Sequence, residues 1–143
     1  MPDFHLKGVV LNYGMYDLTY SHPSIVNAKD AFIVTQQALD STTDAFIPST
    51  ALESRRDPRF SPFYADLQTL EPLPRALFIC GTEDILIDDS VFFATRWMII
   101  NTDTKLQIFP GAFHGFVDFP GMPFAQQGWD CITTFLQENI SGV

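Results

Sequence analysis

Basic residues are scarce in this sequence, which has 8 Lys and Arg against 17 Asp and Glu over its 143 residues. The formal net charge is therefore -9 at pH 7. Nucleic-acid backbones and anionic membrane surfaces are bound through clustered Lys and Arg side chains, and the few basic residues here are scattered along the chain. We therefore expect neither a nucleic-acid partner nor attachment to an anionic membrane surface.

Long apolar runs and cysteines are lacking as well. No run approaches the roughly 18 apolar residues that a membrane-spanning helix needs, and the opening MPDFHLKGVV has no basic segment of the kind that begins a secretory signal peptide. Cys80 and Cys131, both in apolar segments, form neither a metal-binding spacing nor a disulfide framework. These absences predict a cytoplasmic protein with reduced, buried thiols, in which the glycosylation sequon at Asn139 occurs by chance.

Apolar residues are plentiful, at 46% of the chain, which is enough for one domain over residues 1–143 to bury a core. Short apolar runs predict buried strands near residues 8–12, 76–80 and 105–109. Helical spacing of apolar side chains follows the second and third runs, at 88–101 and 124–136. Strands that alternate with amphipathic helices are typical of an α/β fold, so we expect a parallel sheet of about three strands in sequential order, with helical crossovers.

Residues 21–58, between the first two predicted strands, differ from the rest because prolines interrupt a largely polar stretch. The SHPS and IPST segments bracket a predicted helix from about Asn27 to Leu39, and RRDPRFSP is typical of a loop. We expect this stretch to leave the sheet layer as a helical or irregular excursion.

Functional residues of parallel sheets lie on the loops at the carboxyl ends of the strands, which here follow Asn12, Cys80 and Phe109. The second loop contains Asp84, and the third contains His114 in the glycine-flanked segment GAFHGF. Because neighbouring strands are about 5 Å apart, the Asp84 carboxylate could accept a hydrogen bond from the Nδ1–H of His114. Such a contact fixes the imidazole tautomer and leaves Nε2 as a general base.

Other residues compete for these roles. Glu83 lies next to the candidate acid, so spacing cannot exclude it, whereas Asp88 and Asp89 suit the start of the following helix. Either candidate taken singly has an ordinary explanation, the histidine in packing among aromatic residues and the acid in capping a turn. His5, near the amino terminus, and His22, before a proline, show no acid partner in the sequence.

Three segments together, RDPRFSPFYADL, LPRALFICGTEDILIDDS and FPGAFHGFVDFP, resemble the carboxyl-terminal half of the hormone-sensitive-lipase-like esterases of the α/β-hydrolase superfamily. The likeness extends from LKGVVLNYGMYDLT to the final helix. It implies that Asp84, rather than Glu83, is the acid and His114 the base of a Ser-His-Asp triad. It also implies a carboxylesterase for small apolar esters that needs no metal or organic cofactor, with residues 21–58 contributing to a lid over the acyl pocket.

The chain departs from that family pattern, because the nucleophile motif G-x-S-x-G and the upstream HGGG-type oxyanion loop are both missing. None of the eight Ser residues has Gly at both positions two away. We therefore expect a fragment that supplies the acid and histidine of an esterase. Two other hypotheses stay open: a non-catalytic interaction protein derived from half a hydrolase, and one chain of a split enzyme. In each case the first strand would offer an exposed sheet edge to the missing half or to a partner chain.

Overall fold

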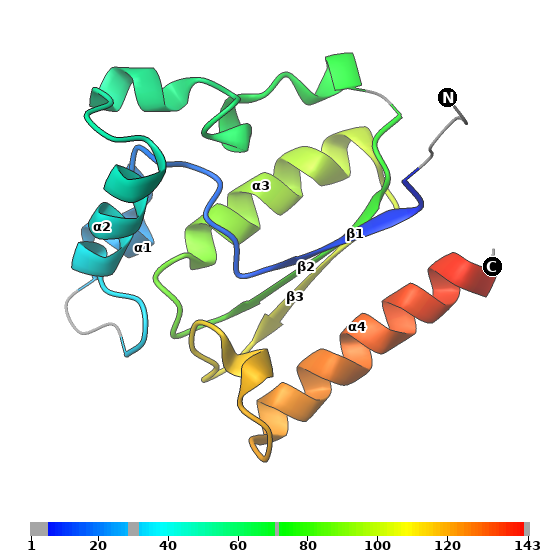
Figure 1. The fold of residues 1–143 in the computed structure, drawn as a ribbon. Helices are drawn as coiled ribbons and strands as arrows, with labels where there is room; N and C mark the ends of the chain where they lie inside the picture. The colour runs from blue at the N-terminus through cyan, green and yellow to red at the C-terminus, as the bar shows by residue number, and fades with distance from the viewer. Residues whose placement is uncertain (1–5, 29–31, 71, 142–143) are drawn as a thin grey trace.

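Three parallel strands form the centre of the computed structural model, which describes residues 6–28, 32–70 and 72–141 (Figure 1). Their order in the sheet is β1 (Gly8–Asn12), β2 (Arg75–Gly81) and β3 (Thr104–Phe109). The parallel pairing and the sequential order confirm the predicted α/β fold. His5 lies outside the described residues.

Helices cover both faces of this sheet (Figure 1). On one face lies α3 (Ile87–Ile100), whose Phe93 packs edge-on against Phe78 of β2. On the other face lies α4 (Pro123–Ser141). Because side chains alternate across a strand, the even-numbered residues in the middle of β2 face α3 and the odd-numbered ones face α4. β2 is thus buried from both sides, as its continuous apolar run predicts.

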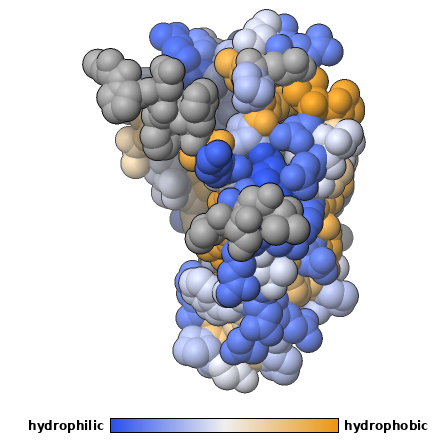
Figure 2. Space-filling view, turned by 90° about the vertical axis from the view of Figure 1, so that its right-hand side faces the viewer, coloured by the Kyte–Doolittle hydropathy of each residue, from blue (hydrophilic) through white to orange (hydrophobic). Residues whose placement is uncertain are grey.

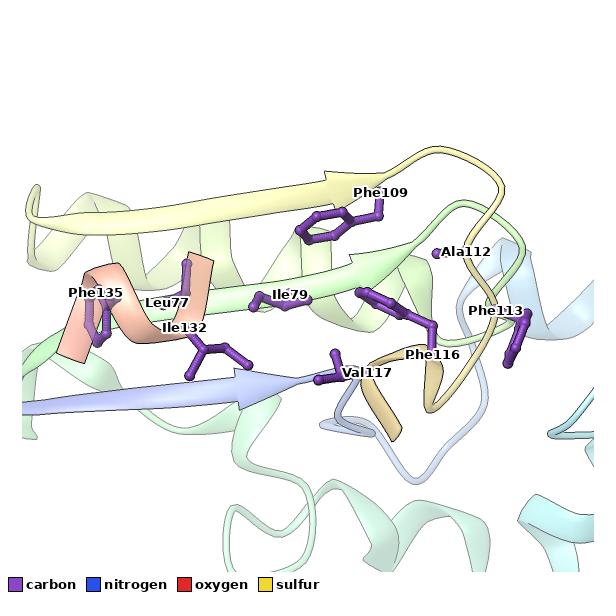
Figure 3. Close-up of a cluster of buried hydrophobic side chains, with 9 residues drawn as sticks. All are labelled: Leu77, Ile79, Phe109, Ala112, Phe113, Phe116, Val117, Ile132 and Phe135. Carbon is purple, nitrogen blue, oxygen red and sulfur yellow. The ribbon is translucent and has the colours of Figure 1, made fainter. Parts of the chain in front are cut away.

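The larger cluster of buried side chains lies between the sheet and α4 (Figure 3). It continues from the middle of β2 into the loop after β3, and its buried members are Leu77, Ile79, Phe109, Ala112, Phe113, Phe116, Val117, Ile132 and Phe135. Burying one Leu, Ile or Phe side chain contributes about 1.5–3 kcal/mol. The core therefore anchors the chain on both sides of His114, through Phe113 before it and Phe116 after it.

Ion pairs mark the opposite end of the sheet, where the strands begin. Arg75, the first residue of β2, lies 3.0 Å from both Asp103 and Glu138. Lys105 on β3 lies 2.8 Å from the same Glu138 carboxylate. Hydrophilic side chains predominate on this side of the molecule (Figure 2). Partly exposed ion pairs of this kind contribute little to stability. The loops with the candidate acid and base lie at the other end of the sheet.

The described parts of residues 21–58 lie beside the sheet layer and not within it (Figure 1). They contain α1 (Pro23–Val26) and α2 (Gln36–Phe46), so the prediction of one helix from about Asn27 to Leu39 is wrong. Residues 29–31, inside that predicted helix, are outside the described part of the chain.

Local capping explains where these two helices begin. Pro23 starts α1 at a position where its missing N–H leaves no hydrogen bond unmade. Thr35 starts α2 because its side-chain oxygen accepts a hydrogen bond from the Ala38 N–H at 3.2 Å. These helix starts depend on single residues and are not visible in the spacing of apolar residues.

The remaining connections contain short 3₁₀ helices, at Leu52–Arg56 (η1), Pro62–Tyr64 (η2), Leu67–Leu70 (η3) and Phe116–Asp118 (η4). None of the helices in the described ranges is both long and apolar enough to cross a membrane.

Candidate active site

The loops after β2 and β3 approach each other closely at Gly81, the last residue of β2. A Cβ atom on Gly81 would lie 1.9 Å from the Ala112 carbonyl oxygen, so any other residue would push the two loops apart. The Thr82 N–H donates to the Phe109 carbonyl at 3.1 Å. The Glu83 N–H donates to the Ala112 carbonyl at 3.0 Å. These contacts hold the loop of the candidate acid against the loop of the candidate base.

Asp84 has a fully buried side chain that receives several hydrogen bonds. Its Oδ1 accepts from the Leu86 N–H at 2.9 Å. Its Oδ2 lies 3.0 Å from Nδ1 of His114 and 3.5 Å from the Cys80 thiol, which donates to it. A buried carboxylate with several donors is held in one orientation. The predicted contact between Asp84 and His114 is therefore present, at the ends of neighbouring strands.

His114 lies in a turn whose two glycines, Gly111 and Gly115, have φ values of 74° and 77°. Such left-handed values favour glycine because it has no Cβ. The imidazole is about one quarter exposed, with Nδ1 directed at Asp84, and its Nε2 makes no hydrogen bond within the described part of the chain. With Nδ1–H donated to the carboxylate, the free lone pair is on Nε2. The pair is arranged to take a proton at Nε2 while Asp84 stabilises the imidazolium.

The competing acids make other contacts. Glu83 is exposed, and its Oε1 lies 3.2 Å from the Thr82 hydroxyl. Asp88 and Asp89 lie in the first turn of α3, at the helix start as expected, although the N-cap residue is Leu86. Asp89 accepts hydrogen bonds from two backbone N–H groups of the loop after β1, at 2.7 and 2.9 Å. Asp88 accepts one from the backbone N–H of Ser24 in α1, at 2.8 Å.

Tyr13, the residue after β1, brings the third strand end to this site. Its ring centroid is 4.8 Å from that of His114, and its hydroxyl donates to Asp118 Oδ2 at 3.3 Å. Burial, together with the charge of Asp118 and this hydrogen bond, raises the pKa of Tyr13 to about 12, so the hydroxyl remains protonated. Sequence reasoning missed this residue, because Tyr13-Gly14 reads only as the end of a strand.

A buried histidine elsewhere in the chain corrects a second expectation. His22 does have acid partners: its Nδ1 lies 3.0 Å from Asp89 Oδ2, and its Nε2 lies 3.6 Å from Asp17 Oδ2. All three side chains are buried. We call Asp17, His22 and Asp89 the His22 network. It connects the loop after β1 and the start of α1 to the first turn of α3.

Opposing effects set the charge of this network. Burial alone would lower the pKa of His22, but the hydrogen bond to Asp89 and the charges of nearby carboxylates raise it above the ordinary value. Burial alone would raise the pKa of Asp17, but hydrogen bonds from neighbouring groups, those of Thr19 first, lower it. The network therefore favours a cationic imidazole between carboxylates.

The two cysteines are free thiols in different settings. Cys80 is buried beside Asp84, and burial together with the charge of that carboxylate raises the pKa of the thiol to about 12. Cys131 is only half-buried, contrary to prediction, because it lies at the margin of the apolar face of α4. Among the described residues, no three His, Cys, Asp or Glu side chains are grouped as metal ligands.

Gly81→Ala is expected to lower the free energy of unfolding by about 3 kcal/mol, because its Cβ would overlap the backbone of the facing loop. Gly111→Ala is the matched control: a Cβ there meets no atom within 4 Å, and only the positive φ makes it unfavourable, by about 1 kcal/mol. Urea denaturation of both variants checks the difference. Equal losses of stability would show that the close approach at Gly81 is not required.

Comparison with known proteins agrees with the fold. A model of the alpha/beta hydrolase fold family matches residues 2–118. The chain belongs to this family. Neutral cholesterol ester hydrolase 1 of Bos taurus is 31% identical over 67 residues, which make up 47% of this chain and 16% of that relative.

Solved structures confirm the resemblance to the hormone-sensitive-lipase-like esterases. A hormone-sensitive lipase from a metagenome library is 27% identical and aligns with 94% of this chain at a TM-score of 0.83. Carboxyl esterase 2 from Tuber melanosporum, 20% identical over 93% of the chain, has the same fold with a TM-score of 0.84. The chain spans 44% of each of these two structures, which is less than half of their length.

Proposed function

We propose that the chain supplies the acid and the base of a serine carboxylesterase, with Asp84 orienting His114 and with the nucleophile on residues that this sequence does not contain. The observation that carries the proposal is the 3.0 Å contact between buried Asp84 and partly exposed His114 at the carboxyl end of a hydrolase sheet. Relatives named hormone-sensitive lipase and neutral cholesterol ester hydrolase support an apolar ester as the substrate.

In this reaction the external serine hydroxyl attacks the ester carbonyl carbon while Nε2 of His114 takes the hydroxyl proton. The resulting imidazolium gives that proton to the leaving alkoxide when the carbon–oxygen bond breaks, and an acyl-serine remains. Water then attacks the acyl group in the same way, with His114 again taking and returning the proton. Asp84 accepts the Nδ1–H hydrogen bond throughout and so keeps Nε2 as the nitrogen that exchanges the proton. None of these steps requires a metal or organic cofactor.

We place the missing half at the free edge of β1. Within the described residues β1 pairs with β2 alone, and all five of its residues are only half-buried, whereas β2 is buried almost throughout. An unpaired strand edge invites another strand. The added strand would come from the same longer chain or, in a split enzyme, from a separate one. A non-catalytic partner that binds this edge is the alternative function.

We propose residues 21–58 as a lid over the acyl pocket. Phe32 in this excursion is 76% exposed, and its ring packs against that of Phe113, the residue before His114, with 5.3 Å between centroids. Ile25 of α1 joins a buried cluster with Ile85, the residue after Asp84. The excursion thus has contacts beside both members of the pair, where an acyl group would enter.

Ester hydrolysis tests the proposed function. We call this chain, joined to an upstream half that carries G-x-S-x-G, the assembled esterase. That half is taken from the metagenomic relative. The chain alone is expected to show no enzymatic turnover of p-nitrophenyl butyrate, because it has no activated nucleophile, and the assembled esterase is expected to turn it over.

Two results would contradict this expectation. Turnover by the chain alone that His114→Ala abolishes would mean that one of its own serines, or a water, acts as nucleophile. An assembled esterase in which both halves fold and associate, but which still lacks activity, would favour the non-catalytic interaction protein.

A further inference from the structure

The backbone at Tyr13 is in an unfavourable conformation. Its φ is 38°, in the left-handed region where glycine is common and bulky residues are rare. The Tyr13 N–H still donates to the Ile79 carbonyl at 2.7 Å, so the pairing with β2 continues into this residue. Backbone strain of this kind persists where the surroundings hold it, and such positions cluster at functional sites.

The side chain of Tyr13 contacts the segment that follows His114. Its ring packs edge-on against buried Phe116, with 6.0 Å between centroids, and its hydroxyl donates to Asp118. Both partners belong to η4, two and four residues beyond His114. Tyr13 therefore connects the end of β1 to the histidine loop at two points.

Between these anchors the Tyr13 ring lies against the imidazole, tilted by 59°. The hydrogen bond to Asp84 restrains one nitrogen of His114 but leaves the ring about one quarter exposed. A side chain held by a single hydrogen bond can still rotate about its Cβ–Cγ bond, and a neighbouring aromatic ring opposes that rotation.

We infer that Tyr13 is a positioning residue that keeps Nδ1 of His114 on Asp84 and Nε2 free, so that all three strand ends build the acid–base site. This inference rests on the proposed function, in which His114 is the base. The aromatic ring is the part that acts on the imidazole, and the hydroxyl serves to anchor it.

Proton NMR of the chain tests this role through the Nδ1–H of His114, which gives a far-downfield, slowly exchanging signal when it is held by a carboxylate. Tyr13→Phe keeps the ring and is expected to retain the signal. Tyr13→Leu and Tyr13→Asn lack the ring and are expected to speed exchange of this proton by about three- to tenfold, the range that an aromatic pair contributes to an equilibrium.

The two ringless variants disturb the fold in different ways. Leu keeps apolar packing on Phe116 but, like Tyr, disfavours positive φ, whereas Asn tolerates positive φ but packs less. Folding of each is checked by circular dichroism, and one folded variant is sufficient. An unchanged exchange rate in a folded ringless variant overturns the role of Tyr13 and leaves the proposed function intact. No such signal in the unsubstituted chain overturns both, because the Asp84–His114 pair would then not form.

Discussion

His114→Ala is expected to lower kcat of the assembled esterase by about 10⁶-fold, because removal of the base alone costs about as much as removal of a whole serine triad. Asp84→Asn is expected to lower kcat by about 10⁴-fold, since an amide at this position favours the wrong imidazole tautomer. The measurement is the initial rate of p-nitrophenyl butyrate hydrolysis over a range of ester concentrations, at equal concentrations of folded protein.

Glu83→Gln is the matched control for Asp84→Asn. It neutralises the adjacent carboxylate in the same loop, but Glu83 is exposed and its carboxylate lies beside Thr82, so kcat should stay within about twofold. If the Glu83 variant loses activity and the Asp84 variant keeps it, the acid is wrongly assigned. If His114→Ala retains most of the activity, the proposed base is wrong.

The sheet and its acid–base contact could be predicted because local and topological rules agree there. RALFIC is a continuous apolar run, and β2 has helices on both faces. A parallel order then decides which loops lie side by side, so Asp84 and His114 could be paired although 30 residues separate them. Their catalytic role remains a prediction.

The positions of α1 and α2 could not be predicted in the same way. The bracketing segments SHPS and IPST favour one helix from about Asn27 to Leu39, but α2 begins after the Thr35 cap and α1 ends after one turn. Such short helices are decided by individual capping contacts, which are worth about 1 kcal/mol each and leave little trace in an apolar pattern.

Contacts between distant polar residues were equally hidden in the sequence. His22 meets Asp89 from 67 positions away, and the strained backbone of Tyr13 is recognisable only once its neighbours are placed. Nothing in SHPS marks its histidine as buried. The first feature depends on how the segment after β1 packs on α3, and the second on how Tyr13 packs on η4. The apolar periodicity of these segments encodes neither contact.

The His22 network yields an expected effect on stability as large as the one predicted for Gly81. His22→Ala is expected to lower the free energy of unfolding by about 3 kcal/mol, because it leaves the buried carboxylates of Asp17 and Asp89 without their shared cation. Urea denaturation of the chain at mildly acidic pH measures this loss. Asp89→Asn and the double variant complete a cycle that isolates the coupling between His22 and Asp89.

The pH dependence of that coupling distinguishes a charged network from simple packing. The folded-state pKa of His22 is raised above its ordinary value of 6.5, so its stabilising contribution is fully present below that pH and is lost as the pH rises through the folded-state value. The lowered pKa of Asp17 acts in the opposite sense: its contribution is present above 3.8 and is lost as the pH falls. The difference between the unsubstituted chain and His22→Ala should therefore be largest between these two ordinary values and shrink toward alkaline pH. A difference that stays constant as the pH rises well beyond 6.5 would mean that His22 contributes by shape and neutral hydrogen bonds alone.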